Sequence, residues 1–63
     1  MKSDLVDIEM QIHHRTDRAV LASDDGDRAN AVWLPLAQIE IATENGKTVV
    51  TMPEWLAMEK GLV

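Results

Sequence analysis

The chain contains no cysteine, no phenylalanine and no tyrosine, and tryptophan occurs only twice. Without cysteine, disulfides and thiolate metal sites are excluded. A chain of 63 residues buries only about 60% of the surface that it exposes when unfolded, and such small domains often need a disulfide, a metal or a partner subunit. We therefore expect the fold to depend on aliphatic packing and on any partner that the chain binds.

Long apolar runs are also missing from the sequence. No segment approaches the roughly 18 apolar residues that cross a membrane. The first four residues, Met-Lys-Ser-Asp, lack the apolar stretch of a signal peptide. We expect a soluble cytoplasmic protein that does not bind membranes. Charged residues at 27% and apolar residues at 46% are ordinary globular values, so residues 1–63 should form one folded domain.

Positive charge is scarce, since eleven acidic residues face six basic ones and the net charge is −5. This balance disfavours non-specific attraction to nucleic acid or to anionic lipid. It keeps a small protein soluble. It also permits binding to a basic partner.

The first half of the chain is typical of short strands. Apolar and polar residues alternate over residues 5–14, which predicts a strand with one buried face. Residues 18–23 are apolar on both faces, which predicts a central strand. The run Asp-Asp-Gly-Asp at residues 24–27 predicts a turn. A third strand is expected over residues 30–34, followed by a single helical or 3₁₀ turn at 35–38.

The second half contains the strongest local signal, Asn45-Gly46, which favours a two-residue hairpin loop. A strand over residues 39–43 would then pair with the segment after Gly46. Glu44 would face Lys47, and the apolar residues would share one core face. The pairs expected beyond Glu44 and Lys47 are Thr43–Thr48, Ala42–Val49, Ile41–Val50 and Ile39–Met52.

A short helix is expected over residues 53–60, because Pro53 suits a first helical turn and Gly61 suits a C-terminal cap. Thr51 and Glu54 have the spacing of a capping box. Two turns of helix are not stable alone, so we expect Trp55 and its neighbour Leu56 to dock on the sheet.

These elements predict a mostly β fold. Five short antiparallel strands within 63 residues usually curl into a small barrel. Because the loops are short, we favour a five-stranded SH3-like barrel closed by the C-terminal helix. An OB-like barrel stays open as the alternative.

From Arg18 onward the chain resembles a group of short hypothetical proteins of bacteria and their phages. The matching stretches are Ala-Val-Leu at 19–21, Trp-Leu-Pro-Leu-Ala-Gln-Ile-Glu at 33–40 and Val-Thr-Met-Pro-Glu-Trp-Leu-Ala-Met-Glu-Lys-Gly-Leu at 50–62. The resemblance implies a phage or mobile-element setting and carries no activity. Relatives often have Lys-Ser where this chain has Leu36-Ala37, which removes a positive charge and a hydroxyl beside Trp33.

No pattern of catalytic or metal-binding residues emerges. His13 and His14 are adjacent, so on a strand they point to opposite faces and do not converge on one metal. The acidic turn lacks the spacing of a calcium loop. No serine, threonine or histidine forms a recognisable nucleophile–base pair. We therefore expect no enzyme, no cofactor and no metal site.

The two tryptophans are the most informative single residues. A core so poor in aromatic residues favours burial of both Trp33 and Trp55, with the two packing near each other and near Pro35. The alternative is a partner surface, since tryptophan is enriched at interface hot spots.

We favour a small protein–protein interaction module, a phage or prophage accessory factor that inhibits a host enzyme or defence complex. The acidic surface would engage a basic site that normally holds nucleic acid. The candidate partner-binding residues are Trp33, Trp55, Asp24, Asp25, Asp27, Glu9 and Glu40.

Two alternatives stay open at this point. One is a small barrel that binds nucleic acid through its basic residues, and its affinity would fall steeply with salt. The other is a self-assembling subunit, because exposed strand edges invite pairing. The candidate phosphate contacts of the first alternative are Arg15, Arg18, Arg28 and Lys47.

Overall fold

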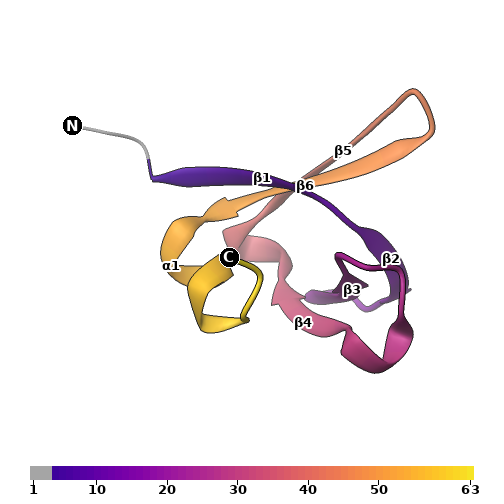
Figure 1. Ribbon diagram of the computed structural model, residues 1–63, viewed down its shortest axis with the longest axis horizontal. Helices are drawn as coiled ribbons and strands as arrows, with labels where there is room; N and C mark the ends of the chain where they lie inside the picture. Colours follow the sequence, from indigo (N-terminus) through magenta and orange to yellow (C-terminus); the bar gives the residue numbers. More distant parts are fainter. Residues whose placement is uncertain (1–3) are drawn as a thin grey trace.

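The computed structural model describes residues 4–63 and contains six strands, two 3₁₀ turns and one α-helix (Figure 1). Residues 1–3, on which the expectation about a signal peptide partly rests, lie outside the described residues. The elements in chain order are β1 (Leu5–Glu9), β2 (Gln11–Arg15), β3 (Ala19–Ser23), η1 (Arg28–Asn30), β4 (Val32–Pro35), η2 (Leu36–Gln38), β5 (Glu40–Glu44), β6 (Lys47–Pro53) and α1 (Glu54–Glu59).

The strands form two antiparallel three-stranded sheets. Sheet A has the order β1-β6-β5 and sheet B has the order β2-β3-β4. The predicted mostly β fold with a C-terminal helix is confirmed. Within residues 4–63 the two sheets do not close into a barrel, so the SH3-like arrangement stays a prediction.

The prediction of one continuous strand over residues 5–14 was wrong, and the physical reason lies at Met10. The Met10 N–H donates to the Thr48 carbonyl at 2.9 Å, which is the last hydrogen bond of this segment to sheet A. From Gln11 onward the chain pairs with β3 instead. The alternation of apolar residues continues through this corner, because a strand that bends from one sheet into another keeps its buried face toward the same core.

Sheet B is built around β3, which is largely buried, as its two apolar faces predicted. The turn before β3 is closed by Thr16, whose hydroxyl accepts the Ala19 N–H at 3.1 Å. The segment after β3 differs from prediction, because η1 occupies Arg28–Asn30 and the next strand begins only at Val32. The Asp27 carboxylate accepts the Ala29 N–H at 2.9 Å and so begins this 3₁₀ turn. The predicted turn after Pro35 is confirmed as η2.

The hairpin of sheet A follows the prediction closely. Glu44 pairs with Lys47, Thr43 with Thr48, and the register continues through Ala42–Val49 and Ile41–Val50. Asn45 and Gly46 have φ values of 52° and 80°, which are the left-handed conformations that a two-residue type I′ loop requires. The hairpin projects away from the rest of the molecule, at the upper right of Figure 1.

The C-terminal helix is shorter than predicted and begins differently. It spans Glu54–Glu59, and no side chain caps its first turn. The predicted capping box is wrong because the Thr51 hydroxyl donates to the Asp7 carboxylate at 2.5 Å instead. Gly61 ends the helix as predicted, with φ of 74°. The Leu62 N–H bonds back to Ala57 at 2.8 Å, the Schellman pattern.

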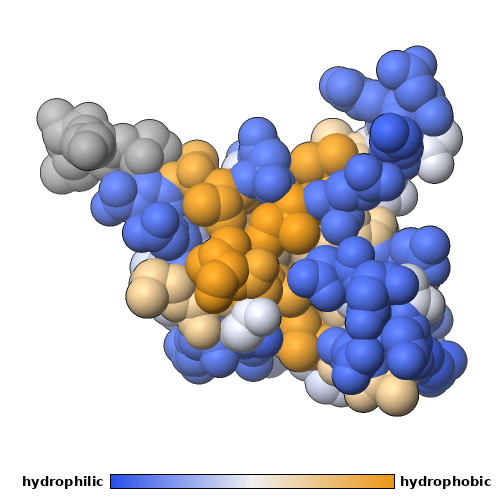
Figure 2. All heavy atoms as spheres, in the orientation of Figure 1, coloured by the Kyte–Doolittle hydropathy of each residue, from blue (hydrophilic) through white to orange (hydrophobic). Residues whose placement is uncertain are grey.

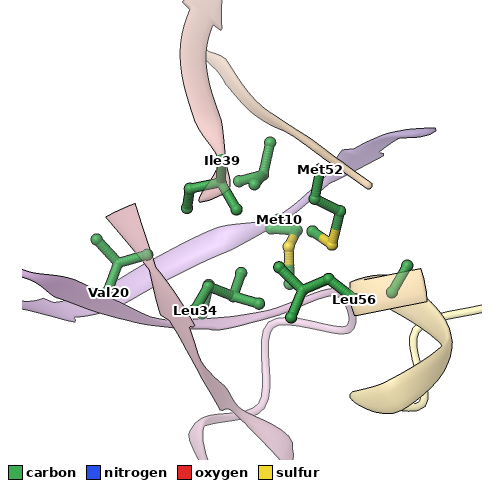
Figure 3. Close-up of a cluster of buried hydrophobic side chains, with 9 residues drawn as sticks. Met10, Val20, Leu34, Ile39, Met52 and Leu56 are labelled. Atoms are coloured by element: carbon green, nitrogen blue, oxygen red, sulfur yellow. The ribbon is translucent and has the colours of Figure 1, made fainter. Parts of the chain in front are cut away.

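One hydrophobic core lies between the two sheets and the helix. Figure 3 shows side chains from sheet A, from sheet B and from α1 pointing toward one another around the Met10 corner. No residue of this core is aromatic, so the aliphatic packing expected from the composition is observed. The buried residues are Met10, Val20, Ala22, Leu34, Ile39, Val50, Met52, Leu56 and Ala57. No helix in the part of the chain that the structure describes is long and apolar enough to cross a membrane.

Candidate functional site

Carboxylates from two distant segments meet at a hollow of about 310 Å³. Glu9, at the end of β1, lies on one side, and Asp24 and Asp25 from the turn after β3 lie on the other. They come together because the Met10 corner brings the end of β1 beside the end of β3, where Gln11 pairs with Ser23. The remaining lining residues are Met10, Gln11 and Gly26. Three of the predicted partner-binding residues therefore share one surface.

The aspartates of this turn differ in whether their carboxylates make hydrogen bonds within the turn. Asp25 accepts the Asp27 N–H at 2.9 Å and the Asn30 side-chain amide at 2.8 Å. These two hydrogen bonds, from the Asp27 backbone first and then from Asn30, stabilise the carboxylate and lower the pKa of Asp25 below its ordinary value of 3.8. Asp27 is occupied as the cap of η1. Both residues hold the turn, whereas the exposed Asp24 and Glu9 are better placed to meet a partner.

The outer face of sheet A carries further acidic side chains. Asp7 and Glu40 both pair with Thr51, from opposite sides, so the three residues form one row across the sheet. Glu9 lies two residues beyond Asp7 and Glu44 lies four beyond Glu40, which places both on the same face. Predicted residues Glu9 and Glu40 therefore share this surface. A smaller hollow of about 180 Å³ touches it, lined by Leu5, Ala37, Gln38, Ile39, Glu40 and Thr51.

Burial of the two tryptophans was predicted wrongly. Trp33 is 45% exposed and Trp55 is 54% exposed. Trp33 points to the outer face of sheet B, where His14 meets it edge-on with ring centroids 6.0 Å apart and planes at 89°. In α1 the buried residues are Leu56 and Ala57, so the helix docks on the sheet through these and turns Trp55 outward. The sequence pattern missed this because the small Ala57 permits closer packing than an indole does.

Figure 2 shows hydrophobic residues gathered in the centre of one face, from the region of β1 and β6 to the C-terminal segment. The tip of the β5–β6 hairpin is hydrophilic in the same view. Leu5, Met58 and Val63 are also exposed, by 59%, 62% and 66% respectively. On the face that Figure 2 shows, hydrophobic and hydrophilic surfaces therefore lie side by side.

The four predicted basic residues are spread over the molecule. Arg15 ends β2 and Arg18 lies in the following turn, so these two flank the same loop. Arg28 lies in η1, beyond the other end of β3. Lys47 lies in sheet A, next to the hairpin tip. The structure thus brings together one pair of the four.

One interaction contradicts the sequence analysis, which found no serine–histidine pair. The His13 Nε2 and Ser23 Oγ atoms lie 2.7 Å apart. The β2 register shifts between Ile12 and His14, so His13 has no partner in β3 and its ring is free to reach Ser23. Ser23 is fully buried, and this hydrogen bond satisfies its hydroxyl at the edge of the core. Ten residues separate the pair, so no local motif could have revealed it.

No group of three or more histidine, aspartate or glutamate side chains within residues 4–63 is arranged to hold a metal ion. No family model matches the chain, and no curated protein or solved structure is significantly similar to it. The similarity to short bacterial and phage proteins therefore stays a resemblance in sequence pattern.

Proposed function

We propose that the protein is a small protein–protein interaction module that binds a basic partner through its acidic surface. The observation that carries the proposal is the convergence of Glu9, Asp24 and Asp25 around one hollow. A chain of net charge −5 has its acids somewhere on the surface, but these three come from segments that only folding brings together.

The biological form of the proposal follows from size, charge and the resemblance to phage proteins. The protein acts as a phage or prophage accessory factor that inhibits a host enzyme or defence complex, by covering a basic site that normally holds nucleic acid. Two small sheets that share one bent strand are compatible with an SH3-like module, which is part of the proposal. The exposed Trp33 and Trp55 are available as apolar anchors for a partner.

The test is capture of partners from a bacterial host lysate, with and without nuclease, read by mass spectrometry. We expect one specific protein to be retained after nuclease treatment. The variant Glu9→Lys with Asp24→Lys should reduce its capture at least tenfold, because both carboxylates are exposed and no hydrogen bond of the turn depends on them. Asp25 and Asp27 are left intact because they hold the turn.

The matched control is Glu54→Lys with Glu59→Lys, which also replaces two carboxylates by two lysines, on the exposed surface of α1. It should leave capture unchanged. Equal loss in the control and the test variant would mean that total charge rather than this surface drives binding. Retention of the partner by the test variant would overturn the proposal.

One observation favours nucleic-acid binding as the second candidate. Trp33 and His14 stand on the outer face of sheet B, and Arg15 and Arg18 flank the loop at the end of β2. Exposed aromatic rings with nearby cations are the usual components of single-strand binding. Loss of all captured material on nuclease treatment, with affinity that falls steeply with salt, would favour this candidate.

A further inference from the structure

The outer edge of β5 is an open hydrogen-bonding surface. In sheet A, β5 pairs only with β6 among residues 4–63. Glu44 and Lys47 flank the two-residue turn and form a hydrogen-bonded pair, so the next pair, Thr43 and Thr48, is a non-hydrogen-bonded one. The Thr48 carbonyl confirms this alternation, because it points to the other side and accepts the Met10 N–H at 2.9 Å.

The backbone groups of two residues therefore point away from the sheet. They are the N–H and C=O of Thr43 and, by the period of two, those of Ile41. Thr43 is exposed, and Ile41 is half-buried only through its side chain on the core face. An extended chain beside β5 would find donors and acceptors at the spacing of an antiparallel ladder.

The other three edges are less suited to an incoming strand. Pro35 ends β4 and donates no hydrogen bond. A register shift interrupts β2 at His13. β1 bends at Met10 into sheet B, so its edge does not continue as a straight strand beyond Glu9. The five residues of β5 contain no proline and pair with β6 without any register shift.

The side chains on β5 select against a second copy of the chain. Glu40, Ala42 and Glu44 share the outer face and are all exposed. If two β5 strands paired antiparallel about Ala42, Glu40 of one copy would lie opposite Glu44 of the other, twice. Like charges directly opposite are destabilising. A strand with lysine or arginine at positions n and n+4 would instead meet both carboxylates.

We infer that β5 accepts an extended, basic segment of a partner protein as a fourth strand of sheet A. The backbone of Ile41 and Thr43 supplies the ladder, and Glu40 and Glu44 select the cationic side chains. This inference rests on the proposed function in taking the partner to be a protein with a basic binding surface, and it names the way in which that partner is held.

The experiment titrates ¹⁵N-labelled protein with a synthetic peptide whose central sequence is Lys-Val-Thr-Val-Lys. The control peptide has glutamate at both lysine positions. We expect amide shifts concentrated at residues 40–44, slowed hydrogen exchange of the Ile41 and Thr43 N–H groups, and no response to the control peptide. The variant Glu40→Gln with Glu44→Gln should weaken binding at least tenfold and retain the backbone ladder.

A second variant tests the backbone separately. Thr43→Pro removes an N–H that points outward and leaves the hydrogen bonds between β5 and β6 intact, so it should fold and abolish binding. Circular dichroism confirms its folding. Glu54→Gln with Glu59→Gln, two exposed residues of α1, is the matched charge control and should bind the lysine peptide as the parent does.

The inference would be overturned if the lysine peptide showed no measurable binding at about 1 mM, the dissociation constant of a weak complex. It would also be overturned by amide shifts centred on another surface, or by undiminished binding of the peptide to both the glutamine variant and the proline variant. If a lysate partner were still captured by the parent and lost with Glu9→Lys and Asp24→Lys, the proposed function would stand while the β5 mode failed. Loss of the lysate partner with Thr43→Pro alone would support the β5 mode directly.

Discussion

The two sheets have the same number of strands and share one bent chain segment, yet they differ in how they are held. Sheet B is enclosed by loops that side chains fasten, since Thr16 closes one turn and Asp25 and Asp27 close the other. The hairpin of sheet A relies on the Asn45-Gly46 loop and projects from the body. Sheet A therefore presents an acidic face and an open edge, whereas sheet B has the more firmly closed loops.

This difference concerns the surfaces and not the core. Val20 and Leu34 from sheet B and Val50 and Met52 from sheet A are all fully buried in one cluster. Both sheets thus contribute to one interior, while the binding that we propose falls on the one element that projects from it. The largest expected effect tests whether the interior is truly shared.

Leu34→Ala in sheet B and Met52→Ala in sheet A should each cost about 2 to 5 kcal/mol of unfolding free energy, because each leaves a cavity in the core. A domain of this size has only about 3 to 9 kcal/mol in total, so either variant should lose a large fraction of its stability. Urea denaturation followed by circular dichroism measures the loss. The exposed Leu5→Ala is the control and should change stability by less than about 0.5 kcal/mol. A large loss for one sheet only would mean that the sheets fold independently.

The two turns sharpen the comparison at an intermediate scale. Gly26 and Gly46 both have φ of 80°, so alanine at either position should cost about 1 to 2 kcal/mol of stability. A Cβ atom at position 46 meets nothing within 4 Å, whereas at position 26 it comes within 3.3 Å of the Gln11 side chain. We expect Gly26→Ala to lower the stability more than Gly46→Ala does, because the new methyl group meets the Gln11 side chain. When Gln11 is also replaced by alanine, the extra loss should disappear. Thermal melts of Gly26→Ala, Gly46→Ala, Gln11→Ala and the double variant Gly26→Ala with Gln11→Ala measure this, and equal costs in both turns would contradict it.

The smallest expected effect is the change in stability with pH that Asp25 causes. The lowered pKa of Asp25 means that its carboxylate stabilises the folded state when pH lies above the ordinary value of 3.8. This contribution is lost as pH falls through the lowered value of the folded state. Asp25→Asn should therefore be less stable than the parent at neutral pH and approach it below about pH 3.8. Thermal melts between neutral and acid pH measure the difference, and a gap that stayed constant with pH would contradict the role given to Asp25.

Local signals in the sequence predicted the hairpin register, the turn at η2 and the end of the helix, because each depends on residues close together in the chain. The pattern did not predict the corner at Met10, since a strand that changes sheets keeps its apolar period. Nor did it predict the exposure of Trp55, because the choice between an indole and the small Ala57 as the docking residue depends on the space beside β6. The sequence predicted which acidic residues are candidates for partner binding. It did not predict that three of them lie around one hollow, because that depends on how the chain folds.

The Met10 corner also has a consequence for how the chain tolerates changes in length. One residue added or removed within β1 would turn the core-facing side chains of that strand to solvent and displace every pairing up to the corner. The same change in the Asn45-Gly46 loop would alter only the reach of an element that already projects outward. Sequence length is therefore constrained where two sheets share a strand, and it is free to vary where the chain extends toward its surroundings.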